Sequence, residues 1–295
     1  MPTAPANGIT LFYDTFGKAS DPAMLLVMGL GAQMTLWEPA FCEALSARGF
    51  HVIRFDNRDV GLSSKIEGGP EPDVARAMAG DHSSASYTLR DMADDAAGLL
   101  DSLGIARAHI VGASMGGMIV QAIAIRHPER VLSMTSIMST TGNREVGQSR
   151  PEAMAALFSP PPASREDAIE QMVRTVRVIG SPGYPADEAE LRKSTGEAYD
   201  RCNYPAGMAR QMVAIIAGGD RTEGLKSVRV PTLVIHGEDD PLVTLSGGQA
   251  TAAAIPGATL LTFPGVGHDI PRQLIGEFVE AITANARRAS AAARA

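Results

Sequence analysis

The chain has little cysteine, no long apolar run and no cluster of basic residues. Its two cysteines, Cys42 and Cys202, stand far apart and outside any C-x-x-C or Cys/His grouping. This pattern argues against a disulfide framework and a structural zinc site, and we expect two free thiols in a reducing compartment. No apolar stretch approaches the roughly 20 residues that a membrane-spanning helix needs.

Clustered positive charge and a secretion signal are also missing. The net charge is −7 at pH 7, and no Lys/Arg-rich run offers a surface for a polyanion. Residues 1–7 lack the basic and apolar regions of a secretory signal. No metal-ligand spacing such as H-E-x-x-H occurs, so neither a metal nor a cofactor is expected. We therefore expect a cytoplasmic protein that acts on a small molecule and binds neither nucleic acid nor membrane.

What is present is an ordinary globular composition, with 45% apolar and 20% charged residues over 295 positions. Short continuous apolar runs, typical of buried parallel strands, alternate with segments of helical periodicity. This alternation predicts a mostly parallel central sheet flanked by helices. The predicted strands are 23–28, 50–56, 108–111, 131–138, 232–236 and 258–263, and the predicted helices are 36–47, 88–103, 115–126, 246–254 and 270–284.

The alternation is interrupted over residues 142–225, where helical patterns stand among proline and glycine breaks without a strand-like run. We predict a helical insertion there, between a first half of the core at 1–141 and a second half at 226–295. An insertion in this position often covers the ligand crevice beyond the C-terminal ends of the strands. The tail, 285–295, is rich in alanine and arginine and is predicted to be a frayed helix end or disordered.

The motif G-x-S-x-G surrounds Ser114, between Gly112 and Gly116. The motif alone is common, but here a predicted strand leads into it and a predicted helix leads out of it, as on a nucleophile elbow. Glycines at these positions avoid collisions on the strained turn, and the helix N-terminus favours negative charge at the hydroxyl. We interpret Ser114 as a nucleophile rather than as an incidental serine in a glycine-rich turn.

A serine hydroxyl needs a base, and the base needs an acid to orient it. In a fold of this kind the acid and then the histidine follow the serine along the chain. His268 stands in a glycine-rich loop after the last predicted strand, whereas the other five histidines lie in or beside strands, at a helix end or before the serine. The acid is one of Glu238, Asp239 and Asp240, because adjacent side chains diverge and only one can face the histidine.

Two backbone N–H groups are predicted to stabilise the negative charge that develops on a substrate carbonyl. One belongs to Met115, directly after the serine, and the other to a loop after an early strand. We assign the second to Leu30, because the glycines on both sides of it let the backbone approach a substrate closely. The residues expected to line the substrate pocket are Gly29, Trp37 and Met138.

The loop at 29–34 has a competing interpretation as a dinucleotide-binding fingerprint. It follows a strand, precedes a helix, and Asp56 ends the next strand. The third glycine position, however, holds Met34, and a nucleotide site would leave the pattern of serine, carboxylate and histidine unexplained. We therefore disfavour it.

The elbow, the carboxylate loop and the terminal histidine together resemble the α/β-hydrolase superfamily over nearly the whole chain. Residues 55–63 (FDNRDVGLS) look like the D-x-R-G-x-G-x-S segment of its esterase and haloperoxidase-like members. Residues 24–30 with 52–56 look closest to aclacinomycin methylesterase-like bacterial carboxylic ester hydrolases. The resemblance implies the α/β-hydrolase fold with a helical cap inserted after the sixth strand, structural roles for Asp56 and Arg58, and Asp240 as the acid. The chain departs from many members at Met28, where they have histidine.

The expected function is hydrolysis of a small or medium carboxylic ester by the triad Ser114, His268 and Asp240, through an acyl-enzyme. The same scaffold also supports carbon–carbon bond hydrolysis, lactone opening, perhydrolysis or a non-catalytic small-molecule receptor. Haloalkane dehalogenases and epoxide hydrolases are disfavoured, because they need a carboxylate at the position of Ser114.

Overall fold

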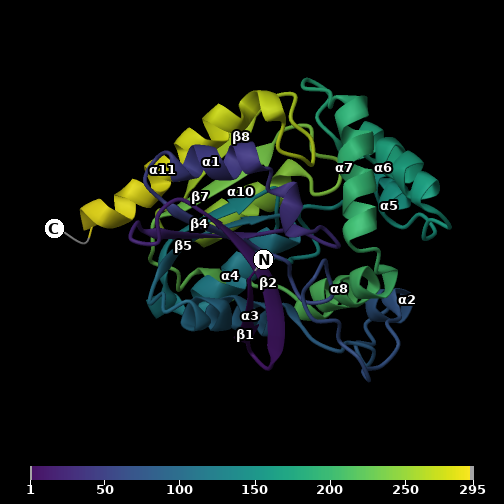
Figure 1. Cartoon of the computed structure of the whole chain (residues 1–295), viewed down its shortest axis with the longest axis horizontal. Helices are drawn as coiled ribbons and strands as arrows, with labels where there is room; N and C mark the ends of the chain where they lie inside the picture. Colours follow the sequence, from purple (N-terminus) through teal and green to yellow (C-terminus); the bar gives the residue numbers. More distant parts are fainter. Residues whose placement is uncertain (1, 293–295) are drawn as a thin grey trace.

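The computed structural model describes residues 2–292 and is organised around one eight-stranded sheet (Figure 1). The strand order is β1-β2-β4-β3-β5-β6-β7-β8. β2 runs antiparallel to β1 and β4, and every other neighbouring pair is parallel. The strands are β1 (Thr3–Ala6), β2 (Ile9–Phe16), β3 (Ala23–Val27), β4 (His51–Phe55), β5 (Ala108–Ala113), β6 (Val131–Ile137), β7 (Thr232–Gly237) and β8 (Thr259–Phe263).

The six strands predicted from apolar runs are all present, and their order gives the sheet its α/β-hydrolase topology. Every residue of β3 and of β5 is buried, as expected of parallel strands that are covered on both faces. The antiparallel pair β1–β2 was not predicted. Its turn falls at Asn7-Gly8, a dipeptide that favours tight hairpins, and β2 alternates only weakly between buried and exposed positions.

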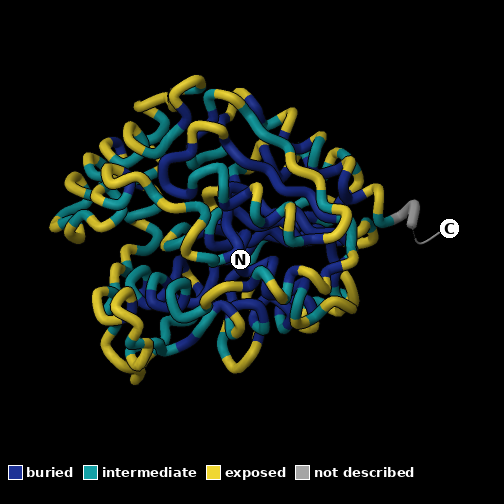
Figure 2. Tube along the Cα trace, turned by 180° about the vertical axis from the view of Figure 1, so that it is seen from behind, coloured by how far each residue is buried: buried dark blue, intermediate teal, exposed yellow. Residues whose placement is uncertain are grey.

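Helices cover both faces of the sheet. α1 (Pro39–Ser46) and α11 (Ile275–Ala292) pack on one face, in a cluster with side chains of β3, β4 and β7, and α3 (Leu89–Ser102) and α4 (Met115–Arg126) pack on the other. α10 (Leu245–Ala254) connects β7 to β8, and short 3-10 turns occur at Met34–Leu36, Pro128–Arg130 and Arg272–Leu274. The buried core therefore lies as two layers around the sheet, beneath exposed helix surfaces (Figure 2).

Local sequence signals explain where α3 begins. The Thr88 hydroxyl accepts a hydrogen bond from the Arg90 N–H, and the Asp91 carboxylate accepts one from the Thr88 N–H at 2.8 Å. This capping box satisfies N–H groups that the first helical turn leaves free. The helix then buries one face, including Met92, against the sheet.

The C-terminal helix departs from the prediction at both ends. α11 starts at Ile275 and continues to Ala292, well into the tail that we expected to be frayed or disordered. The helix persists because alanine has a high helix propensity. In addition, the Asn285 side chain donates to the Met134 carbonyl at 2.9 Å and Ala286 is buried in the core. Residues 293–295 lie outside the described residues.

Between β6 and β7 the chain forms five helices joined by loops, and we call this segment the cap. It projects from one side of the core (Figure 1), where α6 and α7 pack on each other and α8 lies apart from them, next to α2 (Val74–Met78). None of the helices in the described part of the chain has the length and apolar character of a membrane crossing. The cap helices are α5 (Pro151–Leu157), α6 (Arg165–Ile179), α7 (Glu188–Arg201), α8 (Pro205–Gly218) and α9 (Thr222–Leu225).

Candidate active site

Ser114 occupies the sharp turn between β5 and α4. Its backbone has φ 56° and ψ −119°, a strained conformation for a residue with a side chain. A Cβ atom at Gly112 would lie 2.1 Å from the Gly116 carbonyl oxygen, and one at Gly116 would lie 2.0 Å from the Val27 carbonyl oxygen. Only glycine fits at either position, so the motif is required for the turn that raises the serine above the sheet.

The structure brings Ser114, His268 and Asp240 into one line of hydrogen bonds. His268 Nε2 lies 2.9 Å from the Ser114 hydroxyl, and His268 Nδ1 lies 2.7 Å from Asp240 Oδ2. The Asp240 carboxylate accepts a hydrogen bond from the Nδ1–H, which leaves Nε2 without a proton and able to accept a hydrogen bond from the serine hydroxyl. Asp240 is 1% exposed, whereas Ser114 is partly accessible to solvent. The arrangement can therefore activate a hydroxyl that a substrate is able to reach.

The neighbouring carboxylates point elsewhere. Asp240 Oδ1 accepts hydrogen bonds from the Leu242 and Val243 N–H groups at 2.8 and 2.9 Å, which fix the carboxylate beneath the histidine. Asp239 accepts from the Gly265 N–H at 2.8 Å, and Glu238 accepts from the Thr262 hydroxyl at 2.7 Å. Of the three candidates in the acid loop, Asp240 is the one that contacts His268.

A second histidine, His236, lies behind Asp240 and is fully buried. Its Nε2 donates to the Val243 carbonyl at 2.7 Å and lies 3.7 Å from Asp240 Oδ2. Burial lowers the pKa of the His236 imidazole, which favours the neutral ring. His236 thus supports the acid loop without reaching the serine.

The loop with Gly29 and Leu30 lies directly against the nucleophile. A Cβ atom at Gly29 would lie 3.1 Å from Ser114 Cβ and 3.6 Å from Ser114 Oγ. In the hydrogen bonds formed within the described residues, neither the Leu30 N–H nor the Met115 N–H acts as a donor. Neither N–H therefore has an acceptor among the described residues, and Met115 directly follows the nucleophile.

The other two predicted pocket residues are buried. Trp37 is 1% exposed and packs on the ring of Phe41 with 5.2 Å between centroids. Met138 is 6% exposed and has a positive φ of 43°, at the point where β6 ends. Both belong to the cluster between the sheet and α1 with α11.

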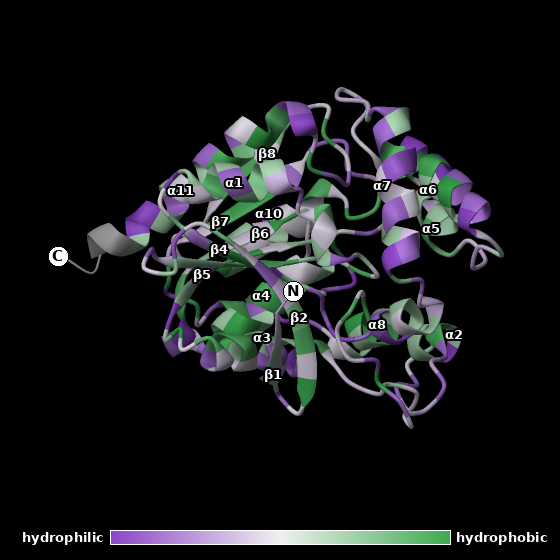
Figure 3. Cartoon of the chain, viewed as in Figure 1, coloured by the Kyte–Doolittle hydropathy of each residue, from purple (hydrophilic) through white to green (hydrophobic). Residues whose placement is uncertain are grey.

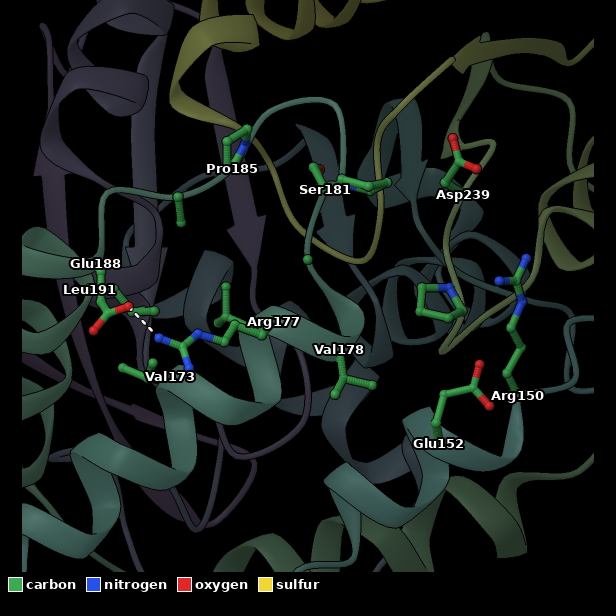
Figure 4. Close-up of a pocket in the computed structure, with 15 residues that line it drawn as sticks. Arg150, Glu152, Val173, Arg177, Val178, Ser181, Pro185, Glu188, Leu191 and Asp239 are labelled. Atoms are coloured by element: carbon green, nitrogen blue, oxygen red, sulfur yellow. Dashed lines mark hydrogen bonds and ion pairs between the residues drawn. The ribbon is translucent and has the colours of Figure 1, made fainter.

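A cavity of about 520 Å³ lies between the cap and the acid loop (Figure 4). Among the described residues, those that line it include no member of the triad and none of the predicted pocket residues. Apolar and charged side chains face it together, and Arg177 and Glu188 pair with each other at 2.7 Å. Its wall includes Val173, Val176, Leu191, Ser181, Asp239 and Pro241.

The cap holds the loop that carries His268. The His268 N–H donates to the Ile179 carbonyl at 2.6 Å, and the Gly267 N–H donates to the Ser181 hydroxyl at 2.9 Å. Ser181 in turn donates to the Asp269 carboxylate, whose pKa is raised by burial. These contacts fix the base loop from the cap side. The sequence carried no signal for them, because Ser181 lies in a segment without a recognisable motif.

Comparisons with known proteins agree with the geometry. The family model for the alpha/beta hydrolase fold matches residues 22–271. The rhodomycin D methylesterase of Streptomyces peucetius is 26% identical over 98% of this chain and 100% of its own length.

Solved structures agree as well. The enol-lactonase from Burkholderia xenovorans LB400 has a TM-score of 0.73 and 26% identity over 96% of this chain and 99% of its own. The meta-cleavage product hydrolase from Pseudomonas fluorescens IP01 has a TM-score of 0.77 over 98% of each chain. Its sequence identity is 22%, so this similarity supports the fold and not a shared activity. With the family model matched over most of its length, the chain belongs to the alpha/beta hydrolase fold family.

Proposed function

We propose that the chain hydrolyses a small or medium carboxylic ester, with Ser114 as nucleophile, His268 as general base and Asp240 as the acid that orients the imidazole. The observation that carries this proposal is the line of hydrogen bonds from Asp240 through His268 to Ser114. The methylesterase relative, which aligns with this chain over nearly the whole length of both proteins, supports ester chemistry.

The proposed reaction has two steps. His268 Nε2 takes the proton of the Ser114 hydroxyl as its oxygen attacks the ester carbonyl, and Asp240 stabilises the imidazolium that forms. The N–H groups of Leu30 and Met115 stabilise the oxyanion, each at an expected ~3–4 kcal/mol judged by removal of a donor. The imidazolium then returns its proton to the leaving alcohol, and water releases the acid from the acyl-enzyme by the same route.

The substrate is expected to be apolar near the reacting carbonyl. The charged side chains around the oxyanion loop are engaged with one another, as in the pairs Arg201–Asp56 and Arg210–Asp59. The Met208 side chain lies against Gly31 in the same loop. A thioether surface of this kind adapts to apolar groups of different shape.

Lactone opening is the second candidate, because a lactone is a cyclic ester and the enol-lactonase is 26% identical over almost the whole of both chains. A panel of linear esters, lactones and β-diketones separates these chemistries from carbon–carbon bond hydrolysis. For the compartment we propose the cytoplasm, which the two free thiols, Cys42 and Cys202, support.

The test of the nucleophile is hydrolysis of p-nitrophenyl acetate by wild type, Ser114→Ala and Ser139→Ala. Ser139 is a matched control, because its buried hydroxyl has no partner within the described residues and lies close to the elbow. We expect Ser114→Ala to lower kcat at least about a thousand-fold, whereas Ser139→Ala stays within a few-fold of wild type. Activity that survives in Ser114→Ala would overturn the nucleophile, and an inactive wild type that binds esters would favour the receptor.

A further inference from the structure

We propose that Gln211, in the cap helix α8, is a positioning residue for the oxyanion hole. Its side chain accepts a hydrogen bond from the Gly31 N–H. This bond fixes the loop, so that the neighbouring Leu30 N–H keeps its orientation toward the substrate carbonyl oxygen. This inference rests on the ester hydrolysis proposed above. It adds a residue that lies almost 100 positions beyond the serine and outside every motif.

The contact is specific. Gln211 is fully buried, its Oε1 accepts a hydrogen bond from the Gly31 N–H at 2.8 Å, and its Nε2 donates to the Arg58 carbonyl at 2.8 Å. The two partners also determine the orientation of the amide, because a flipped group would place a donor against the Gly31 N–H. Gln211 thus joins the oxyanion loop to the chain segment after β4.

The oxyanion loop needs such an anchor because it is intrinsically flexible. Glycine stands on both sides of Leu30, and Gly31 adopts a positive φ of 64°. Glycine loses more conformational freedom on ordering than other residues, so a loop of this composition does not hold its own shape. An oxyanion hole, however, stabilises the transition state only when its donors are already in place.

Among the described residues, three side chains hydrogen-bond to the backbone of this loop, and one of them acts at its centre. Asn57 donates to the Met28 carbonyl at 2.9 Å where the loop begins, and Asp56 accepts from the Met34 N–H at 2.8 Å where it ends. Within the loop, the Ala32 N–H donates to the Gly29 carbonyl at 3.3 Å. The Gly29 carbonyl and the Leu30 N–H belong to one planar trans peptide unit, so the Leu30 N–H points in the direction opposite to that carbonyl. Gln211 fixes the next peptide unit.

Gln211 is itself held firmly. The preceding residue, Arg210, donates to the Asp59 carboxylate at 2.9 Å, and both side chains are buried. Met208, one turn earlier on α8, packs on Gly31, because a Cβ atom built on Gly31 would lie 3.1 Å from Met208 Cγ. α8 therefore reaches the loop with a fixed backbone, and its glutamine acts as a rigid support.

The experiment compares an ester with its thionoester, because sulfur is a weak acceptor and gains little from the oxyanion hole. We measure kcat and KM for p-nitrophenyl acetate and O-p-nitrophenyl thionoacetate with wild type, Gln211→Met, Gln211→Glu and Gln121→Met. Met keeps the volume of Gln211 without an acceptor, whereas Glu keeps an acceptor for the Gly31 N–H. Gln121 is an equally buried glutamine that contacts Arg221 instead of the oxyanion loop.

We expect Gln211→Met to lower kcat for the ester about 10- to 100-fold with little change in KM, and to lower thionoester turnover less than three-fold. Gln211→Glu recovers only part of the ester rate, because its carboxylate accepts from the Gly31 N–H but offers no donor to the Arg58 carbonyl and brings negative charge near the oxyanion. Gln121→Met leaves the ratio of the ester kcat to the thionoester kcat unchanged. Equal loss on both substrates, or no loss, would overturn the role of Gln211. If Gln211→Met does not fold, as judged by circular dichroism, Gln211→Asn replaces it, because the shorter side chain withdraws the acceptor while remaining polar.

The outcome is separable from the proposed function. Suppose that Ser114→Ala is inactive while the ratio of ester kcat to thionoester kcat in the Gln211 variants equals that of wild type. The proposed ester hydrolysis is then upheld, and the positioning role of Gln211 is wrong. If Ser114→Ala retains activity, the proposed function itself fails, and the ratio no longer reports on this oxyanion hole.

Discussion

The cap consists of two parts that are built in different ways. In the anchored part, comprising α8 and Arg201, the last residue of α7, charged side chains are buried against the core. Arg210 and Asp59 are 9% and 0% exposed, and Arg201 and Asp56 are 17% and 0% exposed. In the outer part, comprising α5, α6 and the rest of α7, ion pairs such as Arg165–Asp200 are open to solvent, with 39% and 58% of the side chains exposed.

Hydropathy follows the same division. The helices α6 and α7 carry bands of polar residues, whereas apolar residues are frequent on α8 (Figure 3). Exposed ion pairs contribute little to stability, so the outer part can change its sequence at low cost. Buried pairs tolerate no such change, because removing one partner leaves an uncompensated charge. The comparison indicates that α8 is fixed to the α/β core, while the outer helices tolerate changes in sequence.

The largest effect on stability is expected from Asp59→Ala. This change leaves the Arg210 guanidinium buried without its carboxylate and removes the acceptor of the Tyr87 hydroxyl, which lies 2.8 Å from Asp59. We expect the free energy of unfolding, measured by urea titration, to fall by about 3–5 kcal/mol. The double variant Asp59→Ala with Arg210→Met should recover part of this loss. A single variant as stable as wild type would show that α8 is not anchored by this pair.

A smaller effect is expected from Ser181→Ala, at the point where the segment after α6 holds the base loop. The change leaves the Gly267 N–H and the buried Asp269 carboxyl without their partner. Loss of a buried hydrogen bond costs about 1–3 kcal/mol, and we expect a lower unfolding midpoint together with a several-fold lower kcat on p-nitrophenyl acetate. Ser159→Ala, on a partly exposed serine of the cap, serves as the control. Equal kinetics in both variants would exclude a role for Ser181 in holding His268.

The smallest effect is expected from Asp200→Ala, which removes the exposed partner of Arg165 in the outer part. Solvent already screens this pair, so the unfolding midpoint and kcat should both stay within experimental error of wild type. The variant is the matched counterpart of Asp59→Ala, because each removes one carboxylate from an Arg–Asp pair. A loss comparable to that of Asp59→Ala would remove the distinction between the two parts of the cap.

Local chemistry made the core of this molecule predictable from its sequence. The buried strands appear in the sequence as continuous apolar runs, and the capping pattern at Thr88 predicts the start of α3. The geometry at Ser114 could be anticipated because only a few residue types fit such a turn. The pair β1–β2 escaped prediction because half-exposed strands at one end of the sheet carry a weaker apolar signal than central strands.

The site was predictable only where a motif fixed it. Three adjacent carboxylates at 238–240 were all candidates for the acid, and the choice of Asp240 depended on the family resemblance. The structure then places Asp240 beside His268. Gln211 and Ser181 could not be found from the sequence, because their roles depend on contacts between the cap and distant loops. Tertiary contacts of this kind leave no periodicity or spacing in a single chain.

The role of Ser114 as nucleophile is tested most directly by mass spectrometry after reaction with a fluorophosphonate, which forms a stable adduct with an activated serine. We predict one adduct per chain, on the peptide that contains Ser114, absent from Ser114→Ala and formed far more slowly in His268→Ala. An adduct on a different residue, or equal labelling of Ser114→Ala, would contradict it.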